Sequence, residues 1–255
     1  MRPGLVSVTF RKETPQSIIA LCVANGLEDI EWGGDIHVPH GNQTRAAEVA
    51  SLTREAGLRV AAYGSYYRLG VSESDGLSFA SVLESAVALG APTIRVWAGN
   101  RDSDDADSTW RSLVADDALR CADLSGAEGI SIAYEFHGGT LTNTVDSACA
   151  LLDATVHPFV HILWQPTVGL STEECLAGLR RILPRLLNVH AFHWWPDSAT
   201  RHPLSDGADR WTVYLDEIRA AGLTPSVLLE FVRDGATSAL AQDAATLRSL
   251  LTPAT

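Results

Sequence analysis

Short apolar runs alternate with amphipathic stretches along the whole chain. Five times an expected helix stops at a glycine and an apolar run begins at once: VANGLEDIEW, REAGLRVAAYG, VALGAPTIRVW, GAEGISIAYEF and RAAGLTPSVLLEF. Glycine suits the left-handed residue that ends a helix, and the runs that follow are too short and too continuously apolar to be exposed helices. Each junction therefore predicts a helix followed by a buried strand.

Three more runs, GLVSVTF near the start, FVHILW near 160 and LLNVHAF near 190, complete eight strands, roughly 30 residues apart, each followed by a helical stretch. SLTREAG is expected to close the second helix, SFASVLESAVALG to form the third and STEECLAGLRRIL the sixth, which opens with a Ser/Thr cap and acids. This repeat predicts an α/β protein with a single (β/α)8 TIM barrel over residues 1–255. An open doubly wound sheet is the alternative, but the first strand runs into TFRKETP and not into a glycine-rich phosphate loop.

Composition narrows the class of partner. A chain of 255 residues with 46% apolar content can bury one large core, and its net charge of -12 disfavours nucleic acid. Its four cysteines form no CxxC pair, which favours a reduced, cytoplasmic protein. The N-terminus lacks the apolar core of a signal peptide, and no run approaches the roughly 20 apolar residues that cross a membrane. We therefore expect a small-molecule partner, no nucleic acid and no membrane.

Four expected strands end in a residue that can bind a metal: Glu135 in ISIAYEF, Gln165 in FVHILWQP, His190 in LLNVHAF and Glu230 in SVLLEF. Parallel strands closed into a barrel direct these ends into one mouth. Carboxylates, an imidazole and an amide suit one divalent manganese, magnesium, cobalt or zinc ion. Glu135 and Glu230 could also act as acid and base. In a structural alternative, each glutamate simply pairs with an arginine. A histidine that binds a metal commonly has a partner on its other ring nitrogen, and the sequence does not identify one for His190.

The expected rim combines aromatic rings with charged and amide groups, as sugar sites do. The candidate substrate-binding residues are His37, Tyr67, Arg95, Trp97, His137, Trp164, His193, Trp195 and Arg201. The tryptophans could instead plug the barrel or form a dimer contact, and His137 could be structural. Arg201 lies in the long segment WWPDSATRHPLSDGADRW, expected to be a binding loop or lid, and could hold a phosphate or carboxylate. The acidic stretch NRDSDDADSTW lacks the residues of a calcium loop and predicts a solvated loop before a helix cap.

With LEDIEWGG, AYEFHGGTLTNT, NVHAFHWW and VLLEF at successive strand ends, the chain resembles the xylose isomerase-like barrel superfamily, the sugar phosphate isomerase/epimerase and apurinic endonuclease group. The resemblance implies a divalent metal bound by Glu, Asp, His and Glu on strands 5 to 8, which places ligands at Glu135, His190 and Glu230. Gln165 stands where the family has Asp. An amide oxygen brings no charge, so we expect weaker metal binding or a water in the fourth position.

The resemblance also implies the activity. We expect a metal-dependent isomerase or epimerase that converts a small sugar, sugar phosphate or polyol through an enediolate, with Glu135 and Glu230 sharing the proton transfers. A dehydratase of an inosose- or dehydroshikimate-like substrate and a non-catalytic sugar-binding barrel are the alternatives. Apurinic endonuclease activity is disfavoured, because it needs more metal ligands and a less acidic surface. The resemblance favours a bacterial source, and exposed tryptophans near the rim would permit a homodimer.

Overall fold

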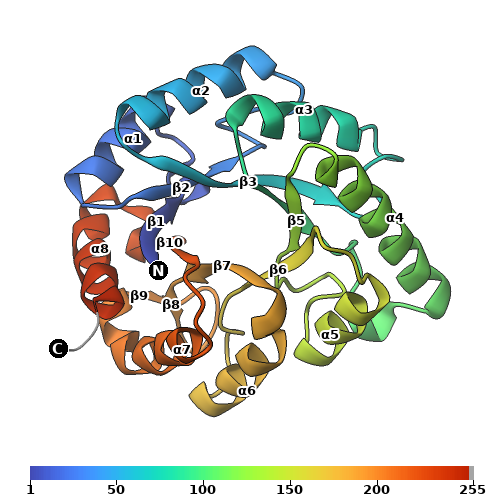
Figure 1. Ribbon diagram of the computed structural model, residues 1–255. Helices are drawn as coiled ribbons and strands as arrows, with labels where there is room; N and C mark the ends of the chain where they lie inside the picture. Colours follow the sequence, from blue (N-terminus) through green and yellow to red (C-terminus); the bar gives the residue numbers. More distant parts are fainter. Residues whose placement is uncertain (253–255) are drawn as a thin grey trace.

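The computed structural model describes residues 1–252 and contains a closed barrel of eight parallel strands (Figure 1). Around the barrel the order of the strands is β1-β10-β7-β6-β5-β4-β3-β2. Their bounds are β1 Arg2–Val6, β2 Asp29–Gly33, β3 Arg59–Arg68, β4 Thr93–Trp97, β5 Ser131–Tyr134, β6 Val160–Trp164, β7 Leu186–Ala191 and β10 Ser226–Leu229. The predicted (β/α)8 barrel is confirmed.

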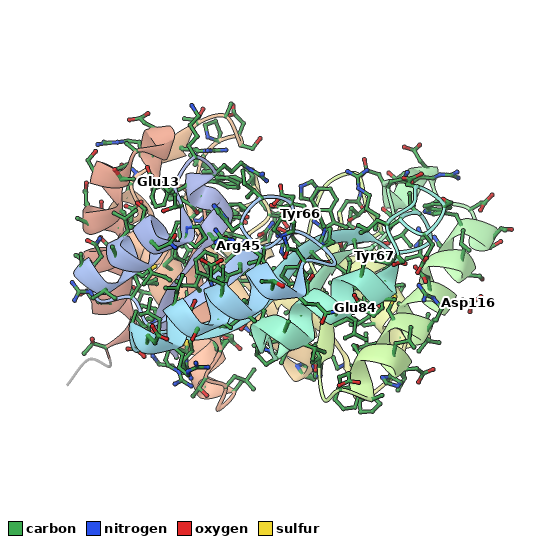
Figure 2. The ribbon with its side chains drawn as sticks, turned by 90° about the horizontal axis from the view of Figure 1, so that it is seen from above. Glu13, Arg45, Tyr66, Tyr67, Glu84 and Asp116 are labelled. Carbon is green, nitrogen blue, oxygen red and sulfur yellow. The ribbon has the colours of Figure 1, made fainter. Side chains whose placement is uncertain are left out.

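Within residues 1–252, eight α-helices form a ring outside the barrel (Figure 1). They are α1 Pro15–Ala24, α2 Gln43–Glu55, α3 Phe79–Leu89, α4 Ser108–Gly126, α5 Val145–Ala154, α6 Thr172–Ile182, α7 Ala208–Ala220 and α8 Thr237–Leu251. Figure 2 shows Arg45, Glu84 and Asp116 on α2, α3 and α4 of this ring. Short 3-10 turns are η1 Ser7–Phe10, η2 Ser103–Asp105, η3 Leu183–Arg185, η4 Leu204–Gly207 and η5 Arg233–Gly235. No helix of the described residues is both long and apolar enough to cross a membrane.

The local signals used to place the helices are present in the structure. The five glycines expected between helix and strand all have positive φ; they are Gly26, Gly57, Gly90, Gly129 and Gly222. Helix α6 begins with a capping box between Ser171 and Glu174, and Asp107 caps α4 after the acidic loop. All four cysteines lie in helices and are free. Because these signals depend on neighbouring residues alone, the sequence suffices to predict them.

The segment after β7, which we expected to be a binding loop or lid, contains regular structure. Part of it forms an antiparallel hairpin from β8 (His193–Trp194) and β9 (Arg201–His202), which pairs His193 with His202 and Trp194 with Arg201. The chain then passes through η4 into α7. The hairpin holds Trp194 and Arg201 as direct cross-strand neighbours, where side chains contact each other most closely.

We predict that Gly4→Ala destabilises the barrel by about 2 kcal/mol or more, because the close packing where β1 joins β10 and β2 leaves no room for a methyl group. A Cβ at position 4 would lie 2.4 Å from Leu228 and 2.5 Å from the carbonyl oxygen of Asp29. Urea unfolding measures the effect. Gly138→Ala is the control, since no described atom lies within 4 Å of its Cβ position. Equal stability of the two variants would contradict the prediction.

Candidate metal centre

Three of the four predicted ligands converge inside the barrel mouth. One ligand atom from each of Glu135, His190 and Glu230 lies within 4.8 Å of the other two, and all three residues are buried. His190 Nδ1 lies 3.6 Å from Glu230 Oε2 and 3.9 Å from Glu135 Oε1. This nitrogen has no hydrogen-bond partner in residues 1–252. It therefore faces the space between two carboxylates, where a cation can bind.

Gln165, the fourth predicted ligand, presents a free oxygen. Its Nε2 donates a hydrogen bond to the carbonyl of Phe136 at 2.7 Å. Its Oε1 is buried and accepts no hydrogen bond from the part of the chain that the structure describes. A buried oxygen without a partner costs about 1–3 kcal/mol, so its position is one that a bound cation would stabilise. The amide orientation thus fits a metal ligand.

Glu31 of β2 is a member of the site that our sequence analysis missed. It is fully buried, and its Oε2 lies 3.0 Å from His190 Nε2 while its Oε1 accepts a hydrogen bond from Arg95 Nε at 2.7 Å. A carboxylate on one ring nitrogen fixes the imidazole and leaves the other nitrogen free for a metal. Glu31 is therefore the partner of His190 that we could not identify. The available signal was an acid inside the apolar strand of LEDIEWGG.

Arg95 of β4, a predicted substrate contact, lies beneath the site with 1% of its surface exposed. Its Nη1 donates to Glu135 Oε2, which also accepts a hydrogen bond from Trp97 Nε1. Burial lowers the pKa of Arg95, but the carboxylates of Glu135 and Glu31 outweigh it and hold that pKa well above its ordinary value. The arginine is a permanent cation that fixes both carboxylates. Glu135 thus pairs with an arginine, as the structural alternative predicted, and also lies close to the other predicted metal ligands, as the metal-binding hypothesis predicted.

The charges of the cluster favour a further cation. The cluster contains three carboxylates and one guanidinium, so two negative charges remain when His190 is neutral. Burial lowers the pKa of His190, but Glu31 and Glu230 outweigh it and raise the pKa to about 10. Burial likewise raises the pKa of Glu31, yet Arg95 and His190 lower it overall to about 2. The same charges would balance a divalent ion, so the residues fit one.

Two unusual backbone positions lie beside this cluster. In β3 the pairing with β4 shifts between Gly64 and Tyr67, and Tyr66 has a φ of 55° with its ring 4.6 Å from the guanidinium carbon of Arg95. Phe231 has a φ of 50° directly after Glu230. Non-glycine residues at positive φ are strained, and such strain concentrates at functional sites. A Cβ on Gly64 would lie 2.7 Å from both Arg95 Nη2 and Glu31 Oε1, so the ion pair occupies the space of a side chain.

One predicted substrate residue, His137, lines a cavity of about 400 Å³ beside the centre, together with Gln165, Phe136, Phe192, Trp194 and Ser198. His137 stacks on Trp97 at 4.2 Å between ring centroids. Arg201 lies over Trp194, with its guanidinium carbon 5.0 Å from the ring centroid. The structure thus brings His137, Trp97 and Arg201 close to the predicted ligands.

Other predicted contacts lie elsewhere. Trp164 packs against Trp211 and Tyr214 of α7, and the Tyr67 hydroxyl lies 3.3 Å from Asp117 of α4, so both side chains face the helices. His37 is buried with Nδ1 2.9 Å from Ser7 Oγ.

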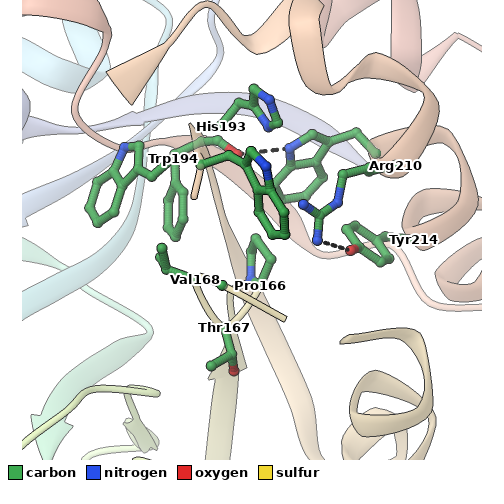
Figure 3. A pocket seen from close by; sticks show the side chains of 11 residues that line it. Pro166, Thr167, Val168, His193, Trp194, Arg210 and Tyr214 are labelled. Carbon is green, nitrogen blue, oxygen red and sulfur yellow. Dashed lines mark hydrogen bonds between the residues drawn. The ribbon is translucent and has the colours of Figure 1, made fainter. Parts of the chain in front are cut away.

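His193 and Trp195 border a second, narrow pocket (Figure 3). There Arg210 lies over Trp195, 4.9 Å from its ring centroid, and donates a hydrogen bond to Tyr214. The predicted substrate residues are therefore divided between the central cavity, this side pocket and the helix layer.

Comparison with known proteins agrees with this architecture. A sequence model of the xylose isomerase-like TIM barrel family matches residues 19–250, and the chain belongs to that family. No curated protein sequence matches it significantly.

Solved structures share the fold at low identity. The probable 3-DHS dehydratase AsbF from Bacillus anthracis is 18% identical, with a TM-score of 0.79 over 97% of this chain and 99% of that one. D-psicose 3-epimerase from Clostridium cellulolyticum H10, solved with D-tagatose, is 14% identical, with a TM-score of 0.78 over 98% of each chain. The IOLI protein with a bound zinc atom is 15% identical, with a TM-score of 0.79 over 98% of each. At these identities the likeness establishes the fold alone.

We predict that Glu31→Gln weakens manganese binding about 10–100-fold, because it removes the carboxylate that orients His190. It should also lower the free energy of unfolding by about 3 kcal/mol, since a buried ion pair with Arg95 is broken. Calorimetric titration and urea unfolding measure the two effects. The control is Glu28→Gln, which removes the same charge from an exposed position. Unchanged metal affinity in Glu31→Gln would remove Glu31 from the site.

Replacing Gln165 tests the fourth ligand. Gln165→Leu keeps a similar size but removes Oε1, so manganese should bind about tenfold more weakly, as for loss of a supporting ligand. Gln16→Leu, at an exposed position on α1, is the matched control. Electron paramagnetic resonance of free manganese gives both affinities. If the two variants bind manganese equally well, Gln165 is not a ligand.

Proposed function

We propose that the protein is a metal-dependent isomerase or epimerase of a small sugar-like substrate, a sugar, sugar phosphate or polyol. The observation that carries the proposal is the convergence of Glu135, His190 and Glu230 in the mouth of the barrel. Membership of the xylose isomerase-like family supports it, as do structural neighbours that include an epimerase and a zinc-containing protein. One divalent ion, manganese, magnesium, cobalt or zinc, would be held by these residues and Gln165. When bound, such an ion polarises neighbouring substrate oxygens and stabilises the negative charge of an enediolate.

The two glutamates have different surroundings and therefore different proposed roles. Glu135 Oε2 already accepts hydrogen bonds from Arg95 and Trp97, so this carboxylate is held in place. The carboxylate of Glu230 accepts no hydrogen bond from any described residue, and its neighbour His190 Nδ1 lies 3.6 Å away. We therefore assign the proton transfer chiefly to Glu230, while Glu135 would serve as a fixed ligand of the metal ion. This proposal modifies the sharing of the proton transfers between Glu135 and Glu230 that we expected from sequence.

The wall of the cavity would orient the substrate and exclude water. Phe136, Phe192 and Trp194 supply apolar surface, and Phe192 stacks on Trp194 with ring centroids 4.0 Å apart. Asn143 and Thr142 provide polar groups on the same lining, as suits hydroxyls around a partly apolar carbon skeleton. Removal of water strengthens the attraction between the charged groups and the substrate.

A dehydratase is the second candidate, favoured because only one of the two catalytic carboxylates, Glu230, lacks a hydrogen bond from the described residues. A single base suffices to remove the proton beside a carbonyl before the neighbouring hydroxyl leaves as water, whereas epimerisation commonly needs a group on each face of the carbon. The fold likeness to a probable dehydratase is compatible with it. The mass of the product separates the two reactions, because dehydration loses one water and isomerisation does not.

Solvent exchange tests the proposal. Manganese-loaded protein is incubated in deuterated water with a panel of ketoses, aldoses and inososes, and deuterium uptake is followed by nuclear magnetic resonance. We expect metal-dependent exchange at the carbon beside the carbonyl of at least one compound. Glu230→Gln should reduce its rate at least about 100-fold, because the base is lost.

Glu128→Gln, an exposed substitution, serves as the control. Binding of a sugar without exchange or product would instead support the non-catalytic sugar-binding barrel.

A further inference from the structure

Arg201 of the β8–β9 hairpin is an arginine without a partner. It is half-buried, and its side chain makes no hydrogen bond or ion pair with any of residues 1–252. Two other arginines at the same end of the barrel are paired, Arg11 with Asp35 and Arg233 with Asp234. Removing a guanidinium from water without compensation is unfavourable, so a half-buried, unpaired arginine indicates a missing anion.

Two aromatic rings hold this guanidinium in place. Its central carbon lies 5.0 Å from the ring centroid of Trp194 and 4.7 Å from that of Phe231. Trp194 is also its direct partner in the hairpin. Rings that contact the faces of a guanidinium leave its N–H groups free at the edge, where they match the two oxygens of a carboxylate or phosphate.

The acid closest to Arg201 in the hairpin is engaged elsewhere. Asp197 Oδ1 accepts hydrogen bonds from the backbone nitrogens of Ala199 and Thr200, at 3.0 and 2.9 Å, and from the Thr200 hydroxyl at 3.0 Å. This local turn fixes the tip of the hairpin. It leaves the positive charge of Arg201 uncompensated.

Arg201 lies over one ring beside the candidate metal centre, Phe231, and over one ring of the neighbouring cavity, Trp194. Phe231 directly follows Glu230, and Trp194 lines the cavity that also contains Gln165. The lining of that cavity includes no carboxylate and no guanidinium. Arg201, lying over Trp194, is therefore placed to meet the charged end of a molecule whose other end reaches the metal ligands.

We propose that Arg201 forms an anion subsite, and that the substrate carries a carboxylate or phosphate group in addition to the neighbouring oxygens that react. The proposal rests on the proposed function, because it assigns a substrate class to the same site. Sugar acids and sugar phosphates then bind in preference to neutral sugars.

Four hydroxamates test this subsite, because a hydroxamate offers a metal two neighbouring oxygens. Acetohydroxamate has no tail, succinic monohydroxamate has a carboxylate tail, its terminal amide has a neutral tail of similar size, and 3-phosphonopropionohydroxamate has a phosphonate tail. Calorimetry on the manganese-loaded protein should show an anionic tail binding about tenfold more tightly than the amide, equivalent to about 1.4 kcal/mol. Whichever anion binds more tightly distinguishes a sugar acid from a sugar phosphate.

Substitutions test whether Arg201 causes the preference for an anionic tail. Arg201→Gln should abolish it, whereas Arg201→Lys, which keeps the charge but loses the planar fork, should retain part of it. Arg101→Gln is the matched control and should retain all of it, because Arg101 also lies over a tryptophan, Trp110 at 4.2 Å, but is exposed and lies over neither Trp194 nor Phe231.

The proposal is overturned if charged and neutral tails behave alike, including when neither binds, or if Arg201→Gln keeps the preference. Failure of the metal proposal has a separate signature, namely no manganese-dependent binding of the tailless acetohydroxamate.

Discussion

The contact of Glu31 with both Arg95 and His190 is the interaction on which the rest of the site depends. One of its oxygens lies 2.7 Å from Arg95 Nε and the other 3.0 Å from His190 Nε2, and all three residues are buried. Through Arg95 it is connected to Glu135, and through His190 to Glu230. Strands β2, β4, β7 and the ends of β5 and β10 are thus joined by charge as well as by backbone hydrogen bonds. A buried network of this kind is costly unless every member is satisfied, which makes the free His190 Nδ1 and Gln165 Oε1 conspicuous.

The barrel and the ends of its strands could be predicted because they depend on local sequence. Helix-ending glycines and short apolar runs define the repeats, and parallel strands in a barrel carry their C-terminal residues into one mouth. That geometry alone was enough to bring Glu135, His190 and Glu230 together. The pairing of Glu31 with His190 could not be predicted, because it depends on which residues of β2 and β7 lie opposite each other across the barrel, 159 positions apart in sequence.

The predictions that Trp164 and Tyr67 contact substrate were wrong because these side chains point away from the barrel mouth. Successive residues of a strand point to opposite faces, so Trp164 and Gln165 cannot both point into the cavity. Trp164 packs on α7, and Gln165 lines the cavity. The direction of the Tyr67 side chain is harder to predict from sequence, because the irregularity in β3 between Gly64 and Tyr67 interrupts the alternation of faces. Sequence gives no direct sign of that bulge, except that Gly64 stands just before it.

Gly64 also limits how this barrel can change. Its missing side chain leaves the volume that Arg95 and Glu31 fill, so a larger residue there and the buried ion pair exclude each other. Any lineage or library that introduces a side chain at position 64 must alter Arg95 at the same time. The two positions should therefore vary together. A protein of this fold with alanine or serine at position 64 is expected to have different charged residues buried in the mouth of its barrel.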